Sequence, residues 1–186
     1  MEGISPKGNI GAKAGPVILL LLLLLVLAGA LPACELFGPI RGGPPGGAEA
    51  RITIGSVEVP SGRSAKVRVT IEVLTGAKAA EIQVGPSQAL LFDPGVIRIK
   101  AITGVGGFTV LASEIKEDEG KGEARFAAVS IYGGVAQGEV LEIELEAVGS
   151  AGEESALELT GVDFLRDETG GEIKPVEITN GRVEIK

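Results

Sequence analysis

The sequence contains no histidine and no tryptophan, and it has only one cysteine and one tyrosine among its 186 residues. Histidine is the usual base that activates a serine or cysteine nucleophile, so its absence argues against that kind of catalysis. The glycine-rich stretches match neither a phosphate-binding Walker loop nor a dinucleotide fingerprint. The sequence therefore predicts a protein that is not an enzyme.

Grouped basic residues are also missing. The chain has 17 Lys and Arg against 25 Asp and Glu, which gives a formal net charge of −8. Binding to nucleic acid needs clustered Lys and Arg that neutralise phosphates. No nucleic-acid partner is expected.

Few residues are suited to hold a sugar or a metal ion. Tyr132 is the only Trp or Tyr, which disfavours a flat aromatic platform for polysaccharide. This argument does not apply to sugar recognition in a polar groove, which is kept as an alternative. Carboxylates gather in segments 113–123 and 167–172, where Ca²⁺ is the one candidate cation, but the spacing lacks the order of an EF-hand loop. Solvated turn acids are the favoured interpretation, and no cofactor or metal site is expected.

A long apolar run lies near the N-terminus. Residues 17–31 read "VILLLLLLLVLAGAL", and the preceding residues carry Lys7 and Lys13 against a single Glu2. A positive segment, an apolar segment and then small residues form the pattern of a secretory signal peptide. The run is short for a spanning helix, which needs about 20 apolar residues. We expect residues 1–33 to be a helical signal peptide.

The single cysteine directly follows this segment. Leu31, Pro32, Ala33 and Cys34 resemble the lipobox of bacterial lipoproteins, although Pro32 departs from the usual small residue. The resemblance implies cleavage before Cys34 and a lipid on its sulfur, which would attach the protein to a membrane. Two alternatives remain. Cleavage after Ala30 would release a soluble protein with a free thiol, or the apolar segment would not be cleaved at all. One cysteine cannot form an internal disulfide.

Residues 34–50 are rich in Gly and Pro, which is typical of a linker that cannot bury an apolar face. Together with the signal peptide, this segment predicts an exported domain, either lipid-anchored at the surface of the cell envelope or secreted.

Residues 51–186 show the period of two that is typical of β-strands with one buried face. The alternation is clear in residues 52–59, 66–73, 96–102 and 139–148. Asn180 and Gly181 predict a two-residue hairpin turn, and Pro86 predicts a break in the strand that contains it. Short strands with frequent turns predict an all-β sandwich or barrel.

The order of three landmarks resembles the cohesin family: "SVEVPSGRSAKVRVTIEV", then "LLFDPGVIRIKAI", then "VEITNGRVEIK". The matching features are Gly62 with Ser64, the triplet Phe92, Asp93 and Pro94, and Gly181 before the last strand. The resemblance implies a single jelly-roll β-sandwich of about nine strands, a fold shared with carbohydrate-binding modules of the same superfamily.

The resemblance also implies a site. Cohesins bind a helical dockerin module through one sheet, whose strands eight, three, six and five correspond here to residues near 156–164, 79–84, 122–132 and 108–115. Gln83, Ser130 and Tyr132 are the candidate partner-binding residues. The polar pattern of the family does not match, since Gly85 and Pro86 interrupt a strand that runs unbroken in cellulosomal cohesins, so no specific contacts are carried over.

One charge pattern has a structural interpretation. Glu142, Glu144 and Glu146 alternate along a predicted strand, and in the jelly roll this strand would lie beside the one that carries Lys66 and Arg68. Opposite charges on neighbouring strands stabilise a sheet by about 0.2–1 kcal/mol per pair. We therefore expect a self-complementary charged face here and not a docking site.

Three functional classes follow from these observations. The leading one is a non-catalytic, cohesin-like module that presents a sandwich face to a dockerin-like or other protein. The alternatives are a carbohydrate-binding module associated with polysaccharide breakdown and a structural lipoprotein of the envelope.

Overall fold

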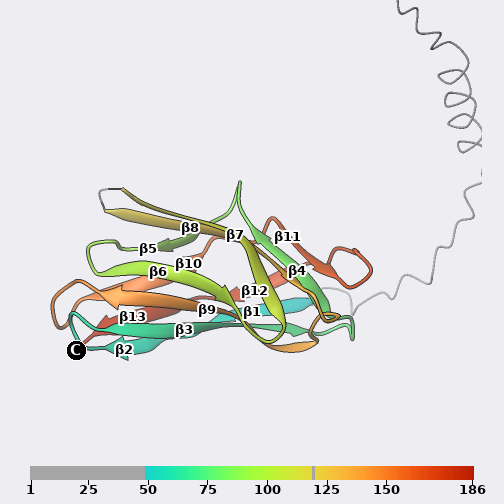
Figure 1. Cartoon of the computed structure of the whole chain (residues 1–186), viewed down its shortest axis with the longest axis horizontal. Helices are drawn as coiled ribbons and strands as arrows, with labels where there is room; N and C mark the ends of the chain where they lie inside the picture. Colours follow the sequence, from blue (N-terminus) through green and yellow to red (C-terminus); the bar gives the residue numbers. More distant parts are fainter. Residues whose placement is uncertain (1–48, 119) are drawn as a thin grey trace, which may run out of the picture. The chain divides into compact units, whose positions relative to one another are not determined.

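The computed structural model describes residues 49–118 and 120–186, which form thirteen β-strands and no helix (Figure 1). The predicted signal peptide, Cys34 and nearly all of the predicted linker lie outside the described residues. The strands are β1 (Ala50–Ile54), β2 (Val57–Val59), β3 (Ser64–Val73), β4 (Ala79–Val84), β5 (Leu90–Phe92), β6 (Ile97–Gly104), β7 (Phe108–Asp118), β8 (Lys121–Ser130), β9 (Gln137–Ala147), β10 (Glu154–Leu159), β11 (Phe164–Asp167), β12 (Val176–Thr179) and β13 (Gly181–Ile185).

The strands form two sheets, as expected for a β-sandwich. The smaller sheet has the order β12-β1-β3-β9-β6. The larger sheet follows the path β11-β4-β8-β5-β10-β13-β2, and β7 pairs with β8 beside this path. The all-β jelly-roll prediction is confirmed. The count exceeds the predicted nine because β2, β5, β11 and β12 are short segments of three or four residues.

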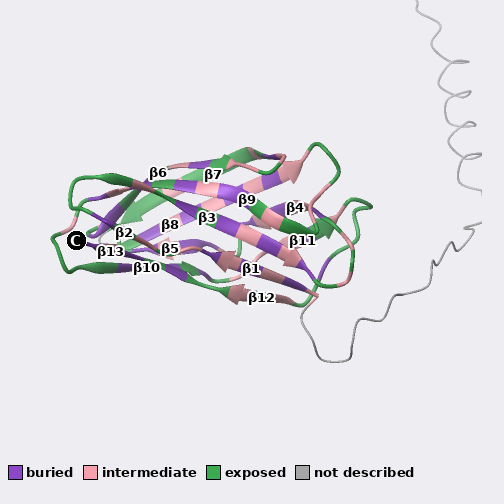
Figure 2. Cartoon of the chain, turned by 90° about the horizontal axis from the view of Figure 1, so that it is seen from below, coloured by how far each residue is buried: buried purple, intermediate pink, exposed green. Residues whose placement is uncertain are grey.

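The core lies between the sheets. Figure 2 shows buried residues alternating with more exposed ones along β3 and β9, as the sequence pattern predicts. Ile71 and Leu141 of the smaller sheet and Ile82 and Leu157 of the larger one are fully buried. Burying one such side chain stabilises a fold by about 1.5–3 kcal/mol. The described domain therefore has a continuous apolar core without any disulfide.

The glutamate-rich face of β9 pairs with β3, which confirms the charge interpretation. Glu142 lies opposite Arg68 in the register, and Glu144 lies opposite Lys66. The Glu142 carboxylate forms ion pairs with Lys66 Nζ at 2.7 Å and with Arg68 Nε at 3.0 Å. The hydrogen bond from Lys66, followed by the positive charges of Lys66 and Arg68, holds the pKa of Glu142 below its ordinary value.

Strand β8 organises the larger sheet. One of its sides pairs with β7 over the whole length, and the other pairs with β4 through residues 126–129 and with β5 through residues 122–124. Strands β4 and β5 are thus two pieces along one side of β8, separated by a turn that starts at Gly85 and Pro86. The predicted break at Pro86 is confirmed, and β7 is an edge strand.

The predicted hairpin at Asn180 and Gly181 is wrong. Strand β12 pairs with β1 in the smaller sheet, whereas β13 pairs with β10 and β2 in the larger one. Asn180 Oδ1 accepts a hydrogen bond from Leu159 N at 3.0 Å instead of closing a turn. The chain crosses between the sheets here, and Gly181 is needed because a Cβ would lie 2.1 Å from the Gly55 carbonyl oxygen.

The predicted strand over residues 52–59 also divides between the two sheets. Strand β1 belongs to the smaller sheet and β2 to the larger, and the chain crosses at Gly55 and Ser56. Ser56 Oγ accepts a hydrogen bond from Arg182 N at 3.0 Å. The two crossings therefore lie against each other, which the alternation of residues could not reveal.

Candidate protein-binding face

Four neighbouring strands, β11, β4, β8 and β7, form the part of the larger sheet that the resemblance singled out. Residues 79–84, 122–132 and 108–115 fall on β4, β8 and β7 as predicted. The fourth predicted segment, 156–164, is wrong. Its residues 156–159 belong to β10 (Glu154–Leu159), which pairs with β5 and β13, and only its last residue, Phe164, lies in β11, which is the neighbour of β4 at residues 164–167. The reason is that β10 and β11 follow each other in the same direction, so that β10 lies beside β5 and β11 lies beside β4.

The side of these strands that faces away from the core is called the outer face below. Residues that lie directly opposite in antiparallel strands project from the same side of a sheet. Ile82, Phe126 and Ala128 are buried, so their neighbours along each strand project outward. The register then defines two rows across the four strands: Phe164, Gln83, Ala127 and Ala112 in one, and Arg166, Glu81, Val129 and Thr109 in the next.

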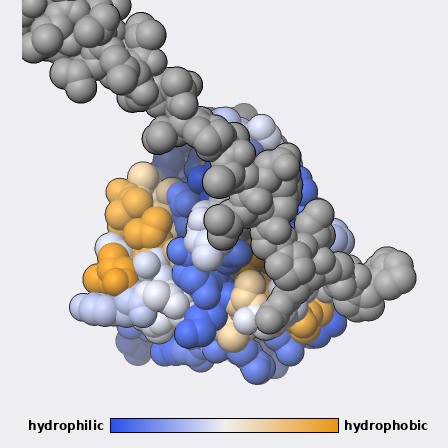
Figure 3. Space-filling view, turned by 90° about the vertical axis from the view of Figure 1, so that its right-hand side faces the viewer, coloured by the Kyte–Doolittle hydropathy of each residue, from blue (hydrophilic) through white to orange (hydrophobic). Residues whose placement is uncertain are grey.

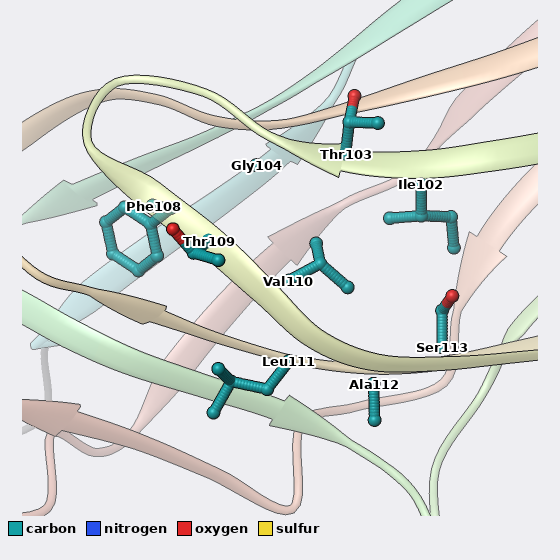
Figure 4. Close-up of a pocket in the computed structure, with 9 residues that line it drawn as sticks. All are labelled: Ile102, Thr103, Gly104, Phe108, Thr109, Val110, Leu111, Ala112 and Ser113. Carbon is teal, nitrogen blue, oxygen red and sulfur yellow. The ribbon is translucent and has the colours of Figure 1, made fainter.

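A β-bulge adds an apolar side chain to the outer face. The register of β7 against β8 shifts between Val110 and Ala112, which leaves Leu111 as an extra residue. Figure 4 shows Leu111 and Ala112 on one side of the β7 ribbon, and Val110 and Ser113 on the side that faces Ile102. Leu111 is 65% exposed. A bulge re-aims side chains in this way, and here it places two consecutive apolar residues on the outer face.

The outer face has a hollow beside the β4–β5 turn, at the end of β4. The hollow has a volume of about 370 Å³. Ala127 and Ala112, opposite each other on β8 and β7, provide a small-residue floor. The remaining lining comes from the neighbouring strands and the β4–β5 turn: Gln83, Val84, Gly85, Pro86, Ser113, Glu114, Arg125 and Phe126.

Hydrogen bonds hold the β4–β5 turn that borders the hollow. Gln83 Nε2 donates to the Gly85 carbonyl oxygen at 2.6 Å. The carboxylate of Asp163, which lies just before β11, accepts hydrogen bonds from the backbone N–H groups of Gly85 and Ser87. The rim of the hollow is therefore fixed from two strands.

Charged side chains surround the hollow. Arg125 Nη2 donates to Glu123 Oε2 at 3.2 Å, and Arg125 Nη1 lies 4.0 Å from Glu114 Oε2. Each glutamate has a second cation, since Lys121 Nζ lies 2.7 Å from Glu123 and Lys116 Nζ lies 3.1 Å from Glu114. The hydrogen bond from Lys121 is the main cause that lowers the pKa of Glu123.

The row beyond the hollow carries a second arginine. The guanidinium of Arg166 lies 4.2 Å from the ring centroid of Phe164, which is cation–π geometry. The same group pairs with Glu81 at 3.5 Å. The outer face thus combines exposed apolar side chains, Leu111 and Ala112 among them, with charge pairs beside them.

The three residues predicted from the sequence occupy different positions. Gln83 lies on the outer face, in the row with Ala127 and Ala112, and borders the hollow. Tyr132 follows the end of β8 and is 83% exposed. Ser130 lies opposite the buried Phe108, on the side of β8 that faces the core, and its hydroxyl accepts a hydrogen bond from Gly134 N at 3.1 Å. Figure 3 shows patches of hydrophobic surface among hydrophilic surface at one end of the sandwich.

Sequence reasoning missed Arg125, Phe164 and the bulge at Leu111. A signal for Arg125 existed, because period two in "ARFAAV" puts Arg125 and Ala127 on the side opposite Phe126. No sequence signal marks the bulge, since both sides of β7 carry apolar and polar residues.

A second groove runs along the open side of the sandwich between β6 and β7 (Figure 4). It has a volume of about 410 Å³ and is lined by Ile102, Thr103, Gly104, Phe108, Thr109, Val110, Leu111, Ala112 and Ser113. No titratable side chain lines it, so it offers no acid–base chemistry.

Several carboxylates of the two acidic segments are engaged by other groups of the described structure. Segment 113–123 covers the end of β7 and the start of β8. Its Glu114 and Glu123 are paired with cations as described above. The hydrogen bond from the Thr169 hydroxyl to Asp167 Oδ1, at 2.7 Å, is the main cause that lowers the pKa of Asp167. The backbone N–H groups of Thr169 and Gly171, both at 2.8 Å from the same oxygen, lower it further. Across residues 49–118 and 120–186, no three Asp, Glu or Cys side chains gather in a way that could hold a metal ion. Within the same ranges, no helix is long and apolar enough to cross a membrane.

The two sheets and the strand path define the cohesin fold, as the sequence predicted. A non-cellulosomal cohesin from the hyperthermophilic archaeon Archaeoglobus fulgidus has a TM-score of 0.54 and 22% identity over 75% of this chain and 92% of that chain. A cohesin module from a family 33 glycoside hydrolase of Clostridium perfringens has a TM-score of 0.58 and 20% identity, over 75% of this chain and 98% of that one.

A chain of the type I cohesin–dockerin complex Coh-OlpC-Doc435 from Clostridium thermocellum has a TM-score of 0.57 and 11% identity, with 78% of this chain and 98% of that chain covered. No protein-family model and no curated protein matches the sequence. The likeness therefore concerns the fold.

Proposed function

We propose that this protein is a non-catalytic module that binds a protein partner through the outer face of β11, β4, β8 and β7. The observation that carries the proposal is the outer face itself, where an exposed bulge leucine and an alanine-floored hollow lie between paired charges. Protein interfaces combine such an apolar centre with a polar rim. Solved cohesins of the same fold include one in a cohesin–dockerin complex, which supports a dockerin-like partner.

A catalytic role has little support in the chemistry of the described residues. Histidine is absent from the whole chain. The carboxylates of the outer face, Glu81, Glu114 and Glu123, are paired with cations, and the hydrogen bond from Lys121 lowers the pKa of Glu123. A carboxyl that acts as a general acid usually has its pKa raised by burial.

Binding can be measured by titration calorimetry against a panel of dockerin modules that includes Doc435. A matched pair of variants assigns the surface. Ala127→Arg fills the hollow, whereas Ala151→Arg places the same side chain on an exposed turn away from the outer face. We expect Ala127→Arg to weaken binding at least tenfold and Ala151→Arg to leave it unchanged. Equal affinity in the two variants would count against the outer face as the binding surface.

We also infer from the sequence that the protein is exported and attached to the envelope by a lipid on Cys34. The support is the apolar run before Cys34 and the lipobox-like residues Leu31 to Ala33. Intact-mass spectrometry of protein from native membranes is the test. A mass that fits a chain starting at Cys34 plus acyl groups, lost in Cys34→Ala, is expected, while an unlipidated chain starting at Leu31 would refute the anchor.

A further inference from the structure

We propose that Arg125 forms a subsite for a carboxylate, so that the hollow in the outer face takes an Asp or Glu side chain of the protein partner. This inference rests on the proposed function, because it uses the outer face as the partner-binding surface. It adds the chemistry of the group that the partner must present.

The hydrogen-bonding capacity of Arg125 is largely unused. A guanidinium has five N–H donors. In the described structure Arg125 makes one side-chain hydrogen bond, from Nη2 to Glu123 Oε2 at 3.2 Å. The 4.0 Å between Nη1 and Glu114 Oε2 is too long for a hydrogen bond. Nε is buried and has no hydrogen-bond partner among the described residues. The Nη1 donors are therefore free to bind an acceptor that enters the hollow.

The arginine is held in place before any partner binds. A Cβ on Gly85 would lie 3.1 Å from Arg125 Cδ and 3.2 Å from Arg125 Cβ, so the bare backbone of Gly85 packs on the arginine stem. Gln83 and Asp163 hold this backbone through the hydrogen bonds described above. The Arg125 side chain keeps 33% of its surface exposed. A restrained arginine loses less conformational entropy when it binds a ligand.

The charge at the hollow itself comes from two side chains. Of the residues that line the hollow, only Arg125 and Glu114 are charged. Glu114 is also paired with Lys116, whose Nζ lies 3.1 Å from its carboxylate, so the Arg125 guanidinium is the group that can attract an anion. A carboxylate matches a guanidinium in charge and in planar geometry. The hollow therefore suits an acidic side chain better than a neutral one.

The subsite can be tested without knowing the partner, by NMR of the full ¹⁵N-labelled chain in an uncharged detergent. The probe is N-acetyl-aspartate methylamide, and the neutral control is N-acetyl-asparagine methylamide. We expect a saturable shift of the Arg125 Nε–H signal with a dissociation constant on the order of 10 mM, about 2.7 kcal/mol of binding free energy. The exposed Arg182, paired with Glu154 at 3.5 Å, should not show saturation. Equal, unsaturated shifts of Arg125 and Arg182 would overturn the proposal.

A second experiment tests whether a protein bound to the outer face uses the subsite. Phage-displayed two-helix proteins with randomised surfaces are selected on the wild-type protein and then tested on four variants, Ala127→Arg, Arg125→Gln, Arg125→Lys and Arg182→Gln. We expect binders sensitive to Ala127→Arg to require an Asp or Glu. They should lose at least tenfold in affinity with Arg125→Gln, lose less with Arg125→Lys and be unaffected by Arg182→Gln. Circular dichroism of each variant verifies that it is folded.

The outcomes separate the two proposals. Binders that are lost with Ala127→Arg but keep full affinity for Arg125→Gln would overturn the carboxylate subsite and leave the outer face as the binding surface. Binders that tolerate Ala127→Arg would count against the outer face itself.

Discussion

Replacing Gly181 by alanine tests whether the two chain crossings really lie against each other. The new Cβ would lie 2.1 Å from the Gly55 carbonyl oxygen, 2.9 Å from the Ile54 carbonyl oxygen and 3.0 Å from the Gly55 carbonyl carbon. All three atoms are backbone, so no flexible side chain can move aside. The start of β13 would have to shift by about 1 Å, since real Cβ atoms stay beyond 3.0 Å.

The expected cost can be set from comparable changes. Overpacking a well-packed region costs about 1–3 kcal/mol, and the shift also strains the hydrogen bond from Arg182 N to Ser56 Oγ. We expect Gly181→Ala to lower the free energy of unfolding by about 3 kcal/mol, or Tm by about 10 °C for a domain of this size. Urea unfolding followed by far-UV circular dichroism measures this loss, because the chain has no tryptophan.

Gly152→Ala is the matched control. Gly152 has a φ of +91° and nothing within 4 Å of its would-be Cβ, so alanine there meets backbone strain without a clash. We expect a loss of about 1 kcal/mol for this change. If Gly181→Ala cost no more than Gly152→Ala, the close approach of the two crossings would be refuted and a turn-like role for Gly181 would be favoured.

Three further predictions concern stability. The pKa of Glu142 lies below its ordinary value of 4.5, so its ion pairs stabilise the fold above that pH, and this stabilisation is lost as the pH falls through the folded-state pKa. In thermal melts from pH 6 to pH 3, Tm should fall less steeply for Glu142→Gln than for the wild type. Asp163→Asn replaces one of the two carboxylate oxygens that accept hydrogen bonds from the β4–β5 turn, and it should lower the free energy of unfolding by about 1–2 kcal/mol in urea. The same change at the exposed Asp118 should have no effect, and equal losses would show that Asp163 does not hold this turn. Leu141→Ala, at a fully buried site, should cost about 2–5 kcal/mol, whereas Leu111→Ala should leave stability unchanged and weaken partner binding; a large loss of stability at Leu111 would show that it packs into the core.

Much of the fold could be predicted from the sequence, because alternation is a direct consequence of a sheet with one buried side. Residues 66–73 and 139–148 matched β3 and β9 closely, and even their charge pairing was predicted. The alternation does not say which sheet a strand joins. Residues 52–59 read as one strand, yet Gly55 sends β1 and β2 into different sheets.

The outer face was predicted less completely. Three of its four strands were placed correctly, and Gln83 lies on it beside the hollow. The fourth strand was misplaced because the path of residues 160–163 depends on contacts such as Asp163 N to Gln83 O, which are distant in sequence. The hollow depends on Ala112 and Ala127, which lie on different strands, and on a turn that is held by hydrogen bonds to Asp163. No local sequence pattern encodes this combination.

The interruption between β4 and β5 has a consequence for how this protein can change. Each piece is held in register by its own pairing with β8, so the intervening residues 85–89 do not set the alignment of either strand. Loops tolerate insertions better than strands do, because lengthening a short loop costs little closure entropy. Mutation or engineering at this turn could thus reshape the hollow, and with it the choice of partner, while the sandwich that supports it stays the same.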